Sequence, residues 1–199
     1  SYLIDKNYSN VPLPLSGLSN SETIFCNENG YYSIYQSDRY GFNNPDMEWD
    51  KEEIEYFLVG DSFTNGDCVN RPKDISSVLR KLSNKSVLSL GQGGNGSLIE
   101  YATLREYLNT NVRKVIWVFS ESNDLYNLSA ELRSEILINY LKNLNFTQNL
   151  KLKQNEIDMI GRETIKKLFE NEEKEINNKN IADFLKLNEI RKLLKNLLP

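Results

Sequence analysis

The most informative feature of this 199-residue sequence is that it contains no histidine. Histidine is the commonest general base, the commonest metal ligand and the usual proton switch near neutral pH. Any catalytic function assigned to the chain must therefore say which other group accepts and donates protons.

Cysteine is nearly as scarce, with Cys26 and Cys68 as the two examples. Two cysteines cannot define a disulfide framework or a four-ligand zinc site. We expect both to be free thiols, and we expect neither a metal nor a cofactor.

Long apolar runs are also missing. No segment has the roughly 20 apolar residues that a membrane-spanning helix needs, and no basic stretch precedes a short apolar core as in a signal peptide. The net charge of −4 and the pI near 5.1 argue against nucleic-acid binding, which needs a basic surface. The sequence indicates neither the compartment nor the oligomeric state.

The length fits one domain that buries its own core. Residues 1–50 are polar and rich in turn formers, which predicts an irregular lead-in packed on the core, with a short strand at Tyr31–Tyr35. Residues 51–125 predict an α/β core. Residues 126–199 predict a helical segment that belongs to the same domain.

The core is organised around Glu55–Gly66, a short apolar run that ends in Gly60-Asp61-Ser62. Such a run, bounded by glycine, is typical of a buried strand. Ser62 then lies at the carboxyl end of that strand, which is where ligands bind in open α/β sheets. The plainer alternative is a loop in which Ser62 only caps a helix.

The rest of the core continues this pattern as βαβαβ. Right-handed crossovers place the loops after all three strands at one edge of the sheet, so we expect Ser62, Gly91–Gly96 and Asn123 to lie close together. Ser97 and Glu100 form a predicted capping box. The predicted elements are strands at Tyr56–Val59, Ser86–Leu90 and Lys114–Phe119, a helix at Arg71–Ser83 with one apolar face (Ile75, Val78, Leu79, Leu82), and a helix at Ser97–Asn109.

These loops together resemble the SGNH, or GDSL-type, hydrolases and acyl esterases over roughly residues 55–125. The matching residues are Gly60-Asp61-Ser62, Gly94 and Asn123-Asp124. Two features depart from the family pattern: Glu121 stands where the family usually has glycine, and the C-terminal Asp-X-X-His element is missing.

The resemblance implies a flavodoxin-like three-layer sandwich with a parallel sheet, of which strand order 2-1-3 is present. It also implies a serine esterase or acyltransferase in which Ser62 is the nucleophile, and Gly94 and Asn123 help form the oxyanion hole. Asp61 and Asp124 are expected to brace their loops. The substrate would be an acyl ester carried by a glycan, a lipid or a small molecule.

The missing histidine leaves two interpretations open, an inactive relative or a piece of a longer chain. We favour the second, because Lys114–Phe119 would otherwise be a long apolar sheet edge, which is an aggregation liability. The remaining strands and the histidine would then follow Pro199.

Two other classes of function compete with the esterase hypothesis. Gly91-X-Gly93-X-X-Gly96 fits a dinucleotide-binding fingerprint, and Glu121 could accept the ribose hydroxyls. A non-catalytic binding domain on the same fold is the other, because fold does not fix function.

Overall fold

The computed structural model describes residues 12–28 and 30–171. The chain divides into two compact units, Ser1–Met159 and Ile160–Pro199. In the second unit the described residues, 160–171, are helical. Residues 172–199, which the sequence predicts to be helical, lie outside the described part.

The centre of the first unit is the predicted parallel sheet, in the order β4-β3-β5. Its strands are β3 (Ile54–Gly60), β4 (Val87–Ser89) and β5 (Val112–Val118). Both neighbours of β3 run parallel to it, which confirms the central position predicted for Tyr56–Val59. The structure therefore has an α/β core with a three-stranded parallel sheet, which is compatible with a flavodoxin-like or Rossmann-like fold.

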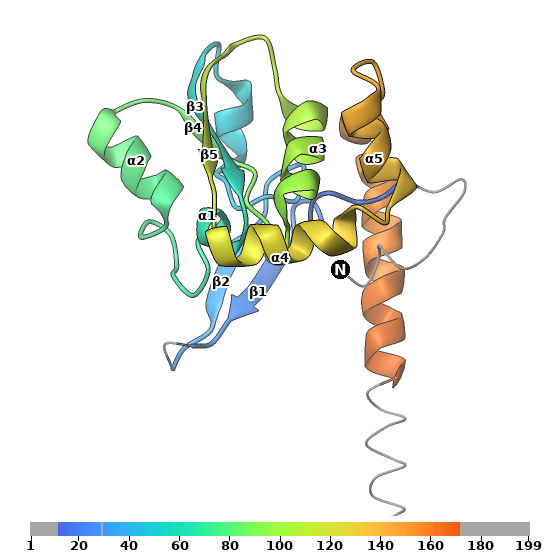
Figure 1. The fold of residues 1–199 in the computed structure, drawn as a ribbon. Helices are drawn as coiled ribbons and strands as arrows, with labels where there is room; N and C mark the ends of the chain where they lie inside the picture. The colour runs from blue at the N-terminus through green and yellow to red at the C-terminus, as the bar shows by residue number, and fades with distance from the viewer. Residues whose placement is uncertain (1–11, 29, 172–199) are drawn as a thin grey trace, which may run out of the picture. The chain divides into compact units, whose positions relative to one another are not determined.

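Two helices cover opposite faces of this sheet, α2 (Ile75–Ser83) and α3 (Ser97–Tyr107) (Figure 1). The main hydrophobic core lies on the α3 side, where Phe57 and Val59 of β3 are fully buried. The lead-in packs on this core too. It contributes Leu13, Leu15, Phe42 and Trp49.

Helix α2 faces the sheet with its polar side. Ser76 and Ser77 are buried, whereas Ile75, Val78 and Leu82 are 44%, 40% and 79% exposed. The apolar face that the sequence predicts is real but is turned away from the core. The helix also begins later than predicted, because Asp74 is its N-cap and accepts a hydrogen bond from the Ser77 N–H at 2.9 Å.

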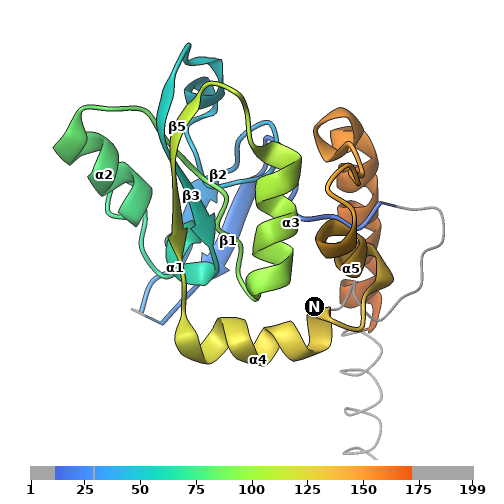
Figure 2. The same ribbon diagram turned by 45° about the horizontal axis from the view of Figure 1, so that its top comes forward.

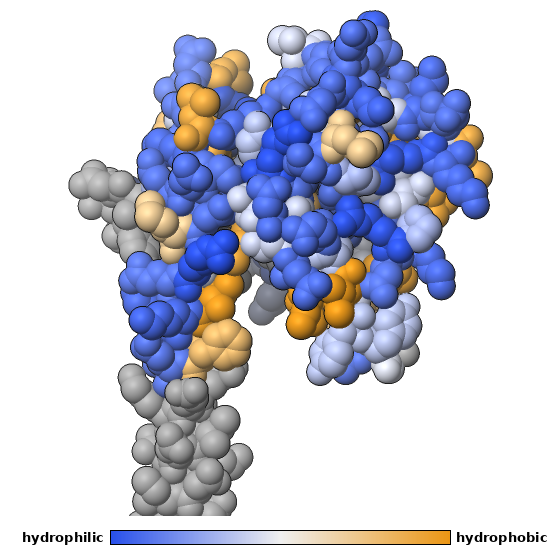
Figure 3. All heavy atoms as spheres, turned by 180° about the vertical axis from the view of Figure 1, so that it is seen from behind, coloured by the Kyte–Doolittle hydropathy of each residue, from blue (hydrophilic) through white to orange (hydrophobic). Residues whose placement is uncertain are grey.

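The lead-in is more regular than predicted, because it forms an antiparallel hairpin. Its strands are β1 (Glu22–Cys26) and β2 (Ser33–Gln36), followed by a short 3-10 helix, η1 (Asp46–Asp50). Ile24 and Ile34 face each other across the hairpin and are 63% and 43% exposed. Figure 3 shows apolar side chains gathered over this hairpin.

The prediction of two free thiols is wrong, because Cys26 and Cys68 form a disulfide. A sequence separation of 42 residues hides this pairing, which arises when β1 is folded against the loop that follows Ser62. The bond ties the hairpin to that loop.

The remaining helices of the first unit cover its α3 side and the end of the sheet. Helix α4 (Glu121–Glu131) lies across the end at which β3 and β5 finish (Figures 1 and 2). Helix α5 (Glu135–Lys142) packs against α3 and is followed by the 3-10 helix η2 (Leu150–Lys153) and by helical residues 154–159. Helix α4 thus lies at the edge where the predicted site is expected, whereas α5 and η2 lie against α3.

Candidate functional site

Ser62 is the first residue of α1 (Ser62–Asn65), a short helix that begins directly after β3. Asp61 is its N-cap, and its Oδ1 accepts a hydrogen bond from the Phe63 N–H at 3.0 Å. Ser62 itself is half-buried, and its hydroxyl makes no hydrogen bond to any described residue. The side chain that caps this turn is therefore Asp61, so Ser62 is not needed as a cap.

Glycines allow the ends of the strands to meet tightly beneath Ser62. A Cβ on Gly60 would lie 2.7 Å from the Val118 carbonyl oxygen at the end of β5. A Cβ on Gly91 would overlap the backbone of Thr64 and Asn65 in α1. The loop after β4 and the end of β5 therefore both touch the turn that carries Ser62.

Gly94 has a left-handed backbone, with φ of +80°, and is exposed. A Cβ built on it would meet nothing within 4 Å, so its surroundings are open and glycine is needed for conformation alone. The side chain of Asn127 donates to the Gly94 carbonyl oxygen at 3.3 Å, which attaches this loop to α4.

Asn123 lies in the first turn of α4, and its side chain is outside the described part of the structure. The next residue, Asp124, is fully buried and accepts a hydrogen bond from the Ser120 N–H at 2.6 Å. Asp61 and Asp124 thus both hold backbone N–H groups, as expected for loop-bracing carboxylates. That Ser62, Gly94 and Asn123 face one cleft stays a prediction.

Glu100 does not form the predicted capping box. Gly96 is the N-cap of α3 and makes no side-chain cap bond, and the Glu100 Oε2 instead accepts a hydrogen bond from the Trp117 Nε1 at 2.6 Å. Glu100 is fully buried, and its Oε1 has no partner among the described residues. Burial, with a smaller contribution from the negative charge of Asp124, raises the pKa of Glu100 to about 8.

Glu131, from the last turn of α4, supplies the cap that α3 lacks. Its carboxylate accepts hydrogen bonds from the N–H groups of Gly96, Leu98 and Ile99, at 2.6, 2.9 and 3.3 Å. Burial nevertheless raises its pKa. Sequence reasoning missed this residue because it lies far along the chain and belongs to no local motif.

The position of Glu131 bears on the nucleotide-binding alternative. In a dinucleotide-binding fold the pyrophosphate lies at the helix N-terminus that follows the glycine-rich loop. Here a fully buried carboxylate occupies that position at the start of α3. An anion would have to displace it, so the glycine pattern loses its main physical support as a nucleotide site.

The buried acids do not form a metal centre. Asp61, Glu100, Asp124 and Glu131 are all buried, and each pKa that is raised is raised mainly by burial. Among the described residues, however, the one group that brings three potential ligand atoms together is Cys26, Glu28 and Cys68. These acids instead accept hydrogen bonds from backbone N–H groups or, for Glu100, from the Trp117 indole.

Comparison with known protein families, curated proteins and solved structures found no match. No helix among the described residues is both long and apolar enough to cross a membrane.

Proposed function

We propose that this chain is the serine-bearing part of an acyl-ester hydrolase or acyltransferase of the SGNH type. The observation that carries the proposal is the position of Ser62 directly after the central strand, where the residue is half-buried and its hydroxyl bonds to no described residue. The turn is capped by Asp61, which leaves the Ser62 hydroxyl available for chemistry.

In the proposed reaction the Ser62 Oγ attacks the carbonyl carbon of an acyl ester, and the alkoxide leaves to give an acyl-enzyme. Backbone N–H groups of Ser62 and Gly94 and the amide of Asn123 would hold the oxyanion. One such donor typically contributes about 3–4 kcal/mol to the transition state. Water then releases the acid, or an alcohol takes the acyl group.

The proton of Ser62 needs an acceptor that the nearby acids do not provide. A pKa of about 8 keeps Glu100 protonated at neutral pH, and one of its oxygens already accepts the Trp117 hydrogen bond. Asp61 and Asp124 are engaged with backbone N–H groups. The proposal therefore includes a histidine from an Asp-X-X-His element that is not in these 199 residues.

The exposed apolar residues of β5 support the same proposal. Val115, Ile116 and Trp117 of β5 are 42%, 36% and 40% exposed, although a strand inside a flavodoxin-like sheet is normally buried. Further strands of the sandwich, paired with β5, would cover these side chains. The histidine would follow the last of those strands.

The test is hydrolysis of p-nitrophenyl acetate by this chain and by a version extended past Pro199. Without a base, the short chain should accelerate the reaction at most about 10³–10⁴-fold over water. The extended protein should gain several orders of magnitude, and Ser62→Ala should remove that gain. Ser129→Ala, at an exposed serine on α4, is the matched control and should change nothing.

Two results would contradict the proposal in different ways. If the extended protein carries the histidine and stays inert on varied acyl esters, the alternative of a non-catalytic binding domain replaces the esterase. If the short chain turns over rapidly and Ser62→Ala stops it, a carboxylate such as Asp124 or Glu121 must be the base, and the role given to histidine is wrong.

A further inference from the structure

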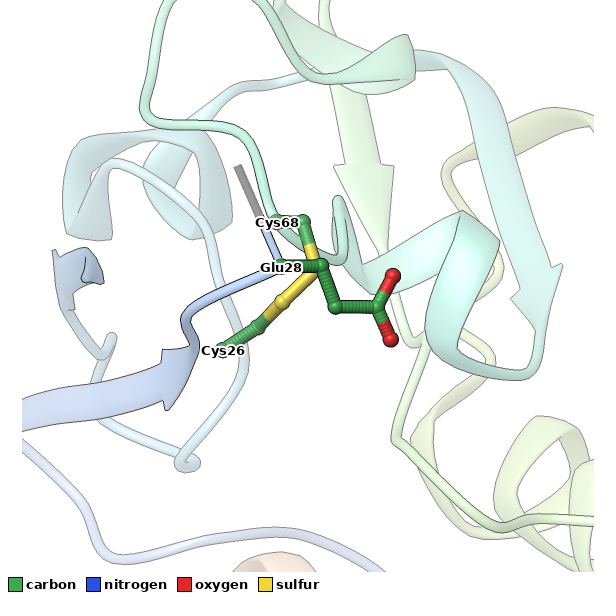
Figure 4. A group of neighbouring side chains, drawn as sticks. All are labelled: Cys26, Glu28 and Cys68. Atoms are coloured by element: carbon green, nitrogen blue, oxygen red, sulfur yellow. A yellow bond between two sulfur atoms is a disulfide. The ribbon is translucent and has the colours of Figure 1, made fainter. Parts of the chain in front are cut away.

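The loop that follows α1 brings sulfur and carboxylate groups together at a place unrelated to the proposed ester chemistry. Figure 4 shows Cys26, at the end of β1, joined to Cys68, with Glu28 beside them. One ligand atom from each of the three lies within 4.8 Å of the others. Asp67 lies next to this group, with its Oδ1 3.5 Å from the Cys68 Sγ, although it is not one of the three residues whose ligand atoms all lie within 4.8 Å of one another.

No lysine or arginine in the described part of the chain balances the charges of this cluster. Neither Glu28 nor Asp67 forms an ion pair with any described lysine or arginine. Burial, together with the negative charge of Glu28, raises the pKa of Asp67. Carboxylates that repel each other in this way are stabilised by a bound cation.

We propose that reduction of the Cys26–Cys68 disulfide converts this cluster into a zinc site with two thiolate and two carboxylate ligands. Four ligands of this kind fit the tetrahedral preference of Zn²⁺, which accepts cysteine sulfur and Asp or Glu oxygen. Counting cysteine and histidine in the sequence misses such a site, because half of its ligands are carboxylates that only the fold brings near.

The chemical step balances with an external dithiol as the reductant. Two electrons and two protons pass from the dithiol to the protein, so that the S–S bond breaks, two S–H groups form and the reductant becomes a cyclic disulfide. When Zn²⁺ binds, both thiols lose their protons to the buffer and the two Zn–S bonds form. In the reverse step a small-molecule disulfide accepts two electrons from the thiolates and two protons from the buffer and becomes a dithiol, while the Cys26–Cys68 bond re-forms and the ion is released.

The site would act on the turn that carries Ser62. The N–H of Asp67 donates to the Ser62 carbonyl oxygen at 3.0 Å, and Gly66 donates to the same oxygen at 3.1 Å. Either the disulfide or the metal ion would therefore hold this loop. The inference does not depend on whether Ser62 is a nucleophile.

The experiment uses Co²⁺ as a coloured substitute for Zn²⁺. The protein is reduced with the dithiol without oxygen, and the reductant is then removed. The reduced protein should bind one Co²⁺ with thiolate charge-transfer absorption and the visible bands of a tetrahedral ion, and Zn²⁺ should bleach both. About two protons should be released per ion at neutral pH. The oxidised protein should show neither signal.

Three substitutions test the proposed ligands, and a fourth serves as the control. Cys68→Ser should remove most of the charge-transfer intensity, and Glu28→Gln and Asp67→Asn should each weaken binding at least about tenfold. Glu22→Gln, at an exposed glutamate on β1, is the matched control and should leave the affinity unchanged. Equal affinity in all four variants, or no Co²⁺ binding by the reduced protein, would overturn the proposal.

Circular dichroism resolves the case in which reduction unfolds the chain. If the reduced protein loses its spectrum, added Zn²⁺ should restore the spectrum of the oxidised protein, because metal-binding free energy then becomes folding free energy. Failure of Zn²⁺ to restore it would contradict the zinc site as surely as the absence of binding by a folded protein.

Discussion

Strands β4 and β5 both lie beside β3, yet β4 has its outer backbone groups bonded by side chains and β5 does not. Asn44 accepts from the Ser89 N–H and donates to the Ser89 carbonyl oxygen, both at 2.8 Å. The Val87 N–H donates to Glu48 at 3.2 Å, and the Val87 carbonyl oxygen accepts from Arg80 at 2.9 Å. Each group that β4 turns outward is thereby satisfied.

No side chain among the described residues bonds to the backbone of β5 in this way. Two surface ion pairs, Arg113–Glu53 and Lys114–Glu55, stand at its beginning, where charged residues discourage strand pairing. After these, Val115, Ile116 and Trp117 are apolar and exposed, although the Trp117 indole donates a hydrogen bond to Glu100. Strand β4 therefore has the features of an edge strand whose outward backbone groups are hydrogen-bonded, and β5 does not.

The largest expected effect comes from removing the Asn44 side chain, which bonds the outward backbone groups of β4. Asn44 is almost fully buried, so Asn44→Ala leaves the Ser89 N–H and carbonyl oxygen without partners in the interior. Each buried unsatisfied group costs about 1–3 kcal/mol, so we expect the free energy of unfolding to fall by about 3–5 kcal/mol. Urea unfolding measures this.

The control for that experiment is Asn139→Ala, at an exposed asparagine on α5. It should change the free energy of unfolding by less than about 0.5 kcal/mol. A loss below about 1 kcal/mol for Asn44→Ala would show that water replaces the amide, and that the β4 edge is not closed by this side chain.

The second effect concerns Glu100, the buried acid that accepts the hydrogen bond from Trp117 of β5. Glu100 has a folded-state pKa of about 8 and an ordinary value of 4.5, so the folded protein binds this proton more tightly than the unfolded chain. Its contribution to stability is complete below pH 4.5 and is lost as the pH rises toward 8. The free energy of unfolding of the unchanged protein should fall as the pH rises from 5 to 8. In Glu100→Gln we expect that fall to be smaller by about 2–3 kcal/mol.

Chemical unfolding at several pH values measures that slope, and Trp117 fluorescence reports on the bonded indole. Glu121→Gln, at an exposed glutamate on α4, should leave the slope unchanged. If Glu100→Gln keeps the wild-type slope, the carboxyl of Glu100 is already ionised at neutral pH, and its bond to Trp117 is a charged one.

The pattern of apolar residues predicts the sheet well because its three strands are short, continuous and bounded by glycine or polar loops. It fails for α2, because hydrophobic periodicity says that a helix has an apolar face and not which way that face points. It also fails for β1, whose Glu22–Cys26 sequence carries no clear strand signal and is held by pairing with β2.

At the site, the sequence predicts the residues that lie in local motifs and misses the residues that the fold brings to them. Ser62 and Gly94 lie in the expected loops because each loop follows a strand directly. Glu131 and the Cys26–Cys68 pair come from distant segments, so no spacing rule could find them. The sequence predicts that Glu100 caps the start of its helix, but in the structure its buried carboxyl bonds to Trp117 of β5.

A third, smaller effect tests whether β5 is an unfinished edge. Ile116→Lys places a charge on the exposed part of the strand, where Ile116 is 36% exposed. In the 199-residue chain we expect a loss of about 1 kcal/mol or less, with reduced self-association in sedimentation at high concentration. If strands beyond this sequence cover β5, the same change in an extended chain should cost several-fold more. An equal cost in both would indicate that nothing packs there.

The smallest effect is expected at α2, the helix that packs against β4. This helix closes β4 through Arg80 while its apolar face points outward, and Leu82 is 79% exposed. Leu82→Gln should therefore change the free energy of unfolding by less than about 0.5 kcal/mol, since little apolar surface is lost from burial. Thermal or urea unfolding of the 199-residue chain measures this change. The contrasting variant is Leu88→Ala: Leu88 of β4 is fully buried, so this substitution should cost about 2–5 kcal/mol. A cost above about 1.5 kcal/mol for Leu82→Gln would mean that the apolar face of α2 is covered in solution. The polar side of α2 would then cover β4, and another element would cover its apolar side. Of the two outer strands, β5 would be the exposed one.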